Sequence, residues 1–216
     1  MNKPKPTGAP DTAVAALLES YKCPTPFHEV RTRFMGNIAS PVMTASPLDT
    51  VKGLWAGEWP AFDSLEAVNE LVQTLIGGLW NRLTEHQNRR NPFRLLRFDV
   101  PQTRDGLTRF ALVRRQELDG FIEGLFGAEN EIDLPERAHK ALDVLAQVRA
   151  FLAGAFDLLD DASKAAEEKD LKALLRDIQK LTLVAETEMN QVILSCTRAR
   201  RELLTSTTPT SKPTAH

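Results

Sequence analysis

Apolar residues recur at gaps of three and four through most of the chain, which is the period of one face of an α-helix. In the N-terminal half this pattern covers residues 12–21, 27–38, 48–55 and 65–83. The stripe over 65–83 has the fewest interruptions, so it predicts the longest helix of this half. The pattern therefore predicts an all-α fold, a helical bundle.

Two longer stripes follow in the C-terminal half, over residues 134–159 and 171–203, behind a short glycine-bearing one over 117–126. A polar stretch, DDASKAAEEKD, separates the two long stripes, so they predict an antiparallel helical hairpin over 134–204. We expect one helical domain over 12–204, made of a body (12–128) and this hairpin. Residues 1–11 and 205–216 lack apolar periodicity and are expected to be disordered.

Three short motifs in the sequence predict where helices begin. Ser46-Pro47 offers a capping hydroxyl and a proline at the first helical position. Asp63 with Glu66, and Asp133 with Glu136, have the spacing of a capping box. Each pair predicts that a helix begins at that point.

The apolar pattern weakens between residues 93 and 113. Turn residues from Pro101 to Gly106 separate the segments FRLLRFDV and LTRFALVRR, in which polar and apolar residues alternate imperfectly. This favours two structures about equally, a short β-ribbon near 93–113 or a loop followed by the next helix.

Charge is unevenly distributed along a chain of 216 residues whose net charge is -2. Residues 82–115 hold nine arginines against three acids, and residues 129–188 hold 14 acids against eight bases. Arg89, Arg90, Arg94 and Arg97 are the candidate partner surface, because arginine binds carboxylates and phosphates. These arginines could instead pair with the acidic hairpin. Nucleic acid is the weaker alternative, since the chain is acidic overall, although Phe93 and Phe98 could provide stacking faces.

The titratable residues do not form a pattern typical of catalysis or metal binding. Four histidines and two cysteines are scattered without ligand spacing, so no metal, cofactor or catalytic residue is assigned. The alternative is an enzyme with a site in a helical groove near Trp55 and Trp59, using Asp119, Glu123 or Arg90. No apolar run reaches the roughly 18 to 20 residues that cross a bilayer, and no signal peptide is evident, so a cytoplasmic location is expected.

A weak internal echo appears at a constant offset of 88 residues. Five residues, including Glu29, Gly36 and Pro47, meet identical residues at Glu117, Gly124 and Pro135. The echo would fit two related helix-turn-helix units, but five identities over some 26 positions are little above chance.

Several short motifs resemble a family of small bacterial proteins called YecA and YgfB. The motifs are EVRTRFMGNIASP, LWAGEWPAF, NPF and GFIEG, at residues 29–41, 54–62, 91–93 and 120–124. The matching residues are structural in type, and they lie between about residues 25 and 155: Ser40, Pro41, Pro47, Trp55, Pro92, Phe93, Gly120, Phe121 and Gly124. With Trp59, the residues Pro41, Pro47, Trp55, Gly120, Phe121 and Gly124 form the candidate structural motif. The chain departs from the family pattern at Arg31-Thr32 and at Glu117-Leu118.

The resemblance implies an all-α protein without an established enzymatic activity, which acts through protein contacts. We therefore expect a regulator or adaptor with a protein partner. Some relatives carry a C-terminal cysteine-rich zinc motif, but this chain has no cysteine after Cys196. A homodimer through the C-terminal hairpin is a further arrangement that the apolar surface of the hairpin would allow.

Overall fold

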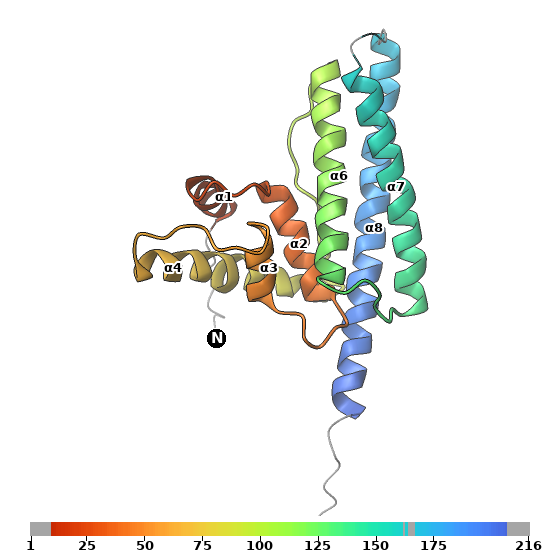
Figure 1. Cartoon of the computed structure of the whole chain (residues 1–216). Helices are drawn as coiled ribbons and strands as arrows, with labels where there is room; N and C mark the ends of the chain where they lie inside the picture. The colour runs from red at the N-terminus through yellow and green to blue at the C-terminus, as the bar shows by residue number, and fades with distance from the viewer. Residues whose placement is uncertain (1–9, 162, 164–166, 207–216) are drawn as a thin grey trace, which may run out of the picture.

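The protein is helical throughout the part described by the computed structural model, residues 10–161, 163 and 167–206. Three long helices stand side by side, and a group of shorter helices packs against the first of them (Figure 1). No strand occurs among these residues. The predicted all-α fold is confirmed.

The shorter helices come first along the chain. They are α1 (Asp11–Ser20), α2 (Phe27–Ala39), α3 (Pro47–Gly53) and α4 (Leu65–Val72). The helix that begins at Leu65 continues through a π-helical segment, η1 (Gln73–Trp80), into α5 (Asn81–Leu83) and a 3₁₀ turn, η2 (Thr84–Gln87). The long stripe over 65–83 thus forms one continuous helical rod, as predicted.

The long helices are α6 (Arg104–Phe126), α7 (Glu136–Asp160) and α8 (Glu168–Ser206). α7 runs antiparallel to both neighbours, and α8 extends beyond the other two at its C-terminal end (Figure 1). The predicted hairpin is therefore present, and α6 joins it as a third long helix. Asp11, Thr205 and Ser206 are helical rather than disordered, while 1–9 and 207–216 lie outside the described residues.

Of the three predicted helix caps, the structure confirms the first, places the second one residue later and lacks the third. Ser46 caps α3 as expected, its hydroxyl accepting from the amide of Asp49 at 3.3 Å. α4 begins one residue later than Asp63 would give, because Ser64 is the cap and accepts from the amide of Ala67. α7 begins at Glu136 behind Pro135 without a side-chain cap, so the capping box expected at Asp133 is wrong.

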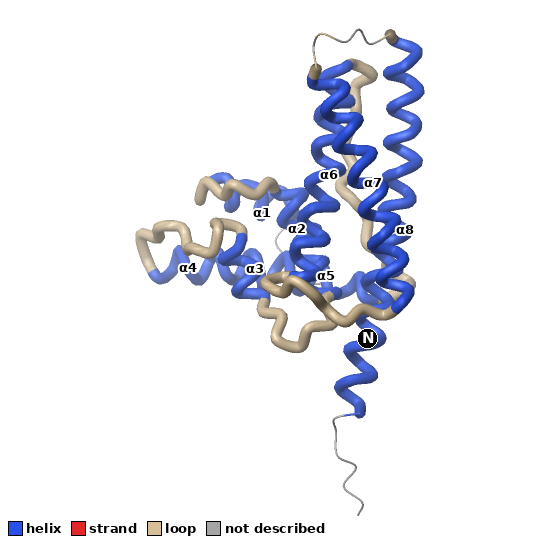
Figure 2. Tube along the Cα trace, turned by 45° about the vertical axis from the view of Figure 1, so that its right-hand side comes forward, coloured by secondary structure: helices blue, strands red, loops and turns tan. Residues whose placement is uncertain are grey.

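The short β-ribbon near 93–113 is also wrong. Residues 91–102 form an extended strap that runs beside α6, and α6 begins at Arg104, capped by the hydroxyl of Thr103 (Figure 2). The helix predicted over 117–126 is thus the second half of a longer one. A ribbon would need a second strand, but the residues after Gly106 bury Leu107, Phe110 and Ala111 at helical spacing instead.

The closest helix packing in the molecule is between α2 and α6, and it is reciprocal at the offset of 88. A Cβ on Gly36 would lie 2.1 Å from the carbonyl oxygen of Phe121, and one on Gly124 would lie 1.9 Å from that of Arg33. His28 and Gln116, also 88 apart, share a hydrogen bond of 2.9 Å. The positions of the internal echo fall on α2–α3 and on α6–α7, and α2 and α6 pack against each other. That the two units are related stays a prediction.

The half-buried His28 predicts a dependence of stability on pH. Burial lowers the pKa of His28 below its usual range, and burial also lowers the pKa of His86. The unfolded chain binds a proton more readily than these folded groups, so the free energy of unfolding should fall as pH drops from 7.5 to 5.5. Urea unfolding at both pH values should show a smaller fall for His28→Gln. The matched variant His139→Gln, on an exposed position of α7, should behave as the unmodified protein; an equal effect of both substitutions would contradict this prediction.

Among the described residues, no helix combines the length and the apolar composition needed to cross a membrane.

Candidate functional site

The strap is held by side chains instead of a neighbouring strand. Asn190 of α8 accepts from the amide of Phe93 at 2.8 Å and donates to its carbonyl oxygen at 3.0 Å. Glu186 accepts from the amide of Leu95, and Glu117 accepts from the amide of Leu96. These bonds satisfy backbone groups that a β-ladder would otherwise pair.

Buried charges form the centre of this arrangement. Glu117 is fully buried and pairs with Arg114, which also donates to the carbonyl oxygen of Leu96 and to the hydroxyl of Thr182. Burial raises the pKa of the Glu117 carboxyl, although the neighbouring Arg114 guanidinium opposes this. The pair thus binds α6, α8 and the strap together.

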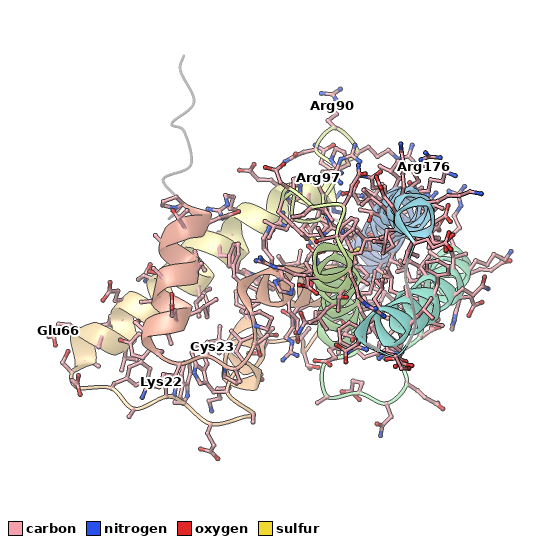
Figure 3. All side chains as sticks on the ribbon, turned by 90° about the horizontal axis from the view of Figure 1, so that it is seen from above. Lys22, Cys23, Glu66, Arg90, Arg97 and Arg176 are labelled. Atoms are coloured by element: carbon pink, nitrogen blue, oxygen red, sulfur yellow. The ribbon has the colours of Figure 1, made fainter. Side chains whose placement is uncertain are left out.

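The four candidate arginines divide into two pairs. Arg94 and Arg97 both bind the carboxylate of Glu186, at 2.9 and 2.8 Å, and that carboxylate is only 1% exposed. Arg89 and Arg90 are exposed and form no ion pair within the described part of the chain. Figure 3 shows Arg90 at the tip of its loop, directed away from the helices, with Arg97 lying closer to the bundle. The interpretation as pairing with the acidic hairpin is correct for Arg94 and Arg97.

Arg89 lines a set of adjoining hollows along α8. We call these hollows together the basic groove. Three hollows of about 310, 240 and 420 Å³ share Arg89 and Leu194 as lining residues. Arginines from three parts of the chain line them: Arg89, Arg94, Arg137, Arg198 and Arg201. Within the described residues, Arg137, Arg198 and Arg201 have no ion pair. Glu136, Glu186 and Glu202 also line the first two hollows, whereas the third, which holds Arg89, Arg198 and Arg201, is lined by no acid among the described residues. The excess of positive charge is therefore greatest at the third hollow.

The aromatic residues of the arginine segment are used by the core. Phe93 is fully buried, with the guanidinium of Arg31 4.9 Å from its ring centre. Phe98 is half-buried and packs edge-to-face on Phe110. Neither ring offers a free stacking face beside Arg89 or Arg90.

The tryptophan elbow belongs to the packing of the shorter helices. Trp55 donates its indole N–H to the carbonyl oxygen of Tyr21 at 3.1 Å, and Trp59 packs on Phe62, which packs on Tyr21. Among the remaining motif residues, Pro47 is the first residue of α3 and Pro41 follows the end of α2. Gly120, Phe121 and Gly124 form the face of α6 that contacts α2.

The carboxylates considered for catalysis are engaged in ion pairs. Asp119 pairs with Arg149 of α7, and Glu123 pairs with Arg33 of α2. Arg90 lies on the loop after η2 and is directed away from the helices. Burial raises the pKa of the Cys196 thiol to about 12, so at neutral pH this thiol is not a nucleophile.

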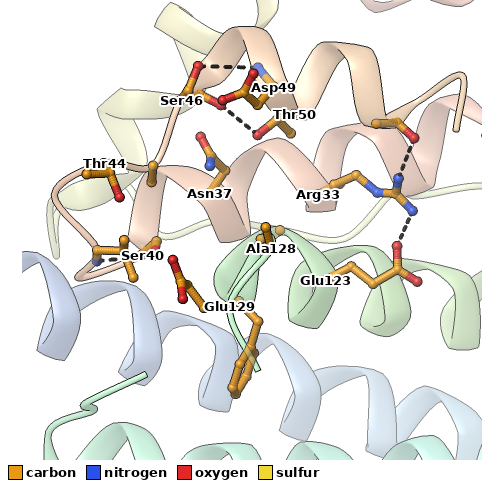
Figure 4. Close-up of a pocket in the computed structure, with 16 residues that line it drawn as sticks. Arg33, Asn37, Ser40, Thr44, Ser46, Asp49, Thr50, Glu123, Ala128 and Glu129 are labelled. Carbon is orange, nitrogen blue, oxygen red and sulfur yellow. Dashed lines mark hydrogen bonds and ion pairs between the residues drawn. The ribbon is translucent and has the colours of Figure 1, made fainter. Parts of the chain in front are cut away.

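One cavity was not predicted from the sequence. It holds about 670 Å³, between α2, the loop 40–46, α3 and the end of α6, and we call it the α2–α3 pocket (Figure 4). Most of its polar lining is contributed by Arg33, Asn37, Ser40, Thr44, Ser46, Asp49, Thr50, Glu123 and Glu129. These residues span almost a hundred positions. Some of them stand in the motifs at 29–41 and 120–124 or in the cap at Ser46, but nothing in the linear order showed that these segments enclose a common cavity.

Within the described ranges, no group of three or more histidine, cysteine, aspartate or glutamate side chains could hold a metal ion. Comparison of the chain with protein-family models, curated proteins and solved structures found no match.

Proposed function

We propose that this protein is a non-catalytic regulator or adaptor that binds an acidic segment of another protein through the basic groove. The resemblance to the YecA and YgfB proteins implies a role through protein contacts, and the acidic partner is inferred from the groove itself. One observation carries the proposal: Arg89, Arg198 and Arg201 converge on a single hollow without an ion pair in the described part of the chain. Arginines left uncompensated at a groove favour a partner that brings carboxylates.

A protein partner fits better than a nucleic acid. The chain has a net charge of -2, which disfavours a long polyanion. Binding to single-stranded nucleic acid also depends on aromatic stacking faces, but Phe93 is fully buried and the half-buried Phe98 packs on Phe110. Leu194 lines all three hollows, so its apolar side chain can be buried against a folded or extended peptide.

The test is affinity purification from the native cell with the triple variant Arg89→Glu/Arg198→Glu/Arg201→Glu. Each reversed arginine should weaken binding by about tenfold or more if it pairs with a carboxylate, since about 1.4 kcal/mol corresponds to that factor. We expect proteins retained by the unmodified chain to be lost from the triple variant and from washes at high salt.

The matched control is Lys172→Glu/Arg176→Glu/Lys180→Glu, which reverses the same number of exposed charges on the other half of α8. It should retain the same proteins. Retention by the triple variant, or loss of the proteins after nuclease treatment, would count against the proposal, and the second outcome would favour nucleic acid.

A further inference from the structure

The α2–α3 pocket contains an amide group for which the fold provides no partner. Asn37 is 5% exposed, and its Oδ1 atom is buried without a hydrogen-bond partner in the described chain. Figure 4 shows the Asn37 side chain between α2 and α3, directed toward the start of α3. A buried polar group without a partner is costly, and native proteins rarely keep one without a reason.

Other polar groups around the pocket are already engaged. Arg33 binds Glu29, Glu123 and the carbonyl oxygen of Gly53 through its two terminal nitrogens, while its Nε atom is buried without a partner among the described residues. The hydroxyl of Thr50 donates to the carbonyl oxygen of Ser46, and the hydroxyl of Ser40 accepts from the amide of Val42. These bonds hold the walls of the pocket, so they do not require a ligand.

A second set of groups remains available. Asp49 and Glu129 are exposed and form no ion pair among the described residues, and the exposed hydroxyl of Thr44 has no bond there either. Both carboxylates line the cavity from opposite walls, Asp49 from α3 and Glu129 from the segment after α6. With Arg33 balanced by its own two acids, the pocket presents net negative charge to an occupant.

The same protein shows what an asparagine amide does with an extended peptide. Asn190 binds both the amide and the carbonyl oxygen of Phe93, and so fixes the strap. Asn37 carries the same two groups, and its acceptor Oδ1 is buried without a partner among the described residues. A cavity of about 670 Å³ lies within the range of pockets that bind small ligands, and it can take a few residues of peptide.

We propose that the α2–α3 pocket binds an extended peptide segment of a partner protein that carries lysine or arginine. Asn37 pairs with the backbone of this segment, as Asn190 pairs with Phe93, and Asp49 and Glu129 bind its cationic side chain. The site uses none of the residues of the basic groove, so its failure and the failure of the proposed function are separate results.

The probes are acetylated, amidated hexapeptide mixtures that are randomised except at two central positions, which are both Lys, both Arg, both Ala or both Glu. Binding to the isotope-labelled full chain is followed by NMR through the amide signals of Asn37, Thr44 and Glu129. The Lys and Arg mixtures should shift these signals, and the Ala and Glu mixtures should do so at least tenfold more weakly. Spermidine serves as a small amine without a peptide backbone, and it should not reproduce the shift of the Asn37 side-chain amide.

Two variants test the roles of the residues. In Asn37→Leu the peptide-induced shifts should be at least tenfold smaller. The Tm should be unchanged or raised, because the unpartnered amide is removed. Asp49→Asn/Glu129→Gln, at exposed positions that do not endanger folding, should lose the preference for Lys and Arg. The controls Asn69→Leu and Glu66→Gln/Glu70→Gln, on exposed positions of α4, should bind as the unmodified chain does.

The proposal fails if no mixture shifts the pocket signals at millimolar concentration, or if the Glu mixture binds as well as the Lys mixture. It also fails if Asn37→Leu lowers the Tm, which would make the amide structural, or if spermidine reproduces every shift, which would make the pocket an amine site. The basic-groove variant Arg89→Glu/Arg198→Glu/Arg201→Glu should still bind the Lys and Arg mixtures.

Discussion

Replacing Gly124 with alanine should destabilise the protein by about 3 kcal/mol or more, because overpacking against backbone has no soft neighbour to displace. A Cβ at this position would lie 1.9 Å from the carbonyl oxygen of Arg33 and within 3.0 Å of its Cα. α2 would have to move away from α6, and the contacts of Phe34 and Phe121 in the core would loosen with it. Thermal unfolding should show a fall in Tm of roughly 6 to 12 °C for a domain of this size.

Gly154→Ala is the matched control for this substitution. Gly154 lies inside α7, is exposed, and has nothing within 4 Å of an added Cβ. Alanine there should stabilise the helix by up to about 1 kcal/mol. Surface substitutions usually change the free energy of unfolding by no more than about 0.5 kcal/mol. If Gly124→Ala changed it by no more than that, α2 and α6 would not pack this closely in solution.

Arg114→Met should lower the free energy of unfolding by about 3 to 5 kcal/mol, because it leaves the carboxylate of Glu117 buried without its cation. The carboxylate is fully buried, and only the amide of Leu96 remains to bind it. The double variant Arg114→Met/Glu117→Leu should be less destabilised than Arg114→Met alone, because no buried charge is left unpaired. Urea unfolding of the two variants measures the difference.

Arg149→Met makes the same chemical change in an ion pair near the surface, where Arg149 is 49% exposed and Asp119 is 23% exposed. It should lower the free energy of unfolding by no more than about 1 kcal/mol.

The buried pair of Arg114 and Glu117 also predicts a dependence of stability on pH. Burial already raises the pKa of Glu117, so the folded state binds this proton more tightly than the unfolded chain does. Arg114→Met should therefore regain stability as pH falls from 7 toward 5; a variant that became less stable over this range would contradict the assignment.

The arginine segment shows how far a site could be predicted from sequence. A surplus of arginine over residues 82–115 marked the region, but it did not distinguish Arg89 from Arg94, five positions away. That distinction depends on Glu186, which lies about 90 residues later and reaches the strap only because α8 packs beside it. Arg198 and Arg201, which complete the basic groove, were missed because their stretch of α8 reads as the end of an amphipathic helix.

Local chemistry and periodicity determined which segments are helical. The capping hydroxyl of Ser46, the apolar stripe over 65–83 and the two long C-terminal stripes act within a few turns of the chain, so the sequence contains all the information they need. The positions of the weak echo at an offset of 88 fall on α2–α3 and α6–α7, but the sequence did not show that α2 and α6 pack against each other.

Only the tertiary structure decided the rest, since it depends on residues that are distant in sequence. Residues 91–102 form a strap because Asn190, Glu186 and Glu117 supply hydrogen bonds that a neighbouring strand would otherwise provide. The α2–α3 pocket and its unpartnered Asn37 exist because α3 and the end of α6 enclose the same space. A hydrogen bond or a cavity wall between such residues leaves no periodic trace in the sequence, because each partner satisfies only its own local pattern.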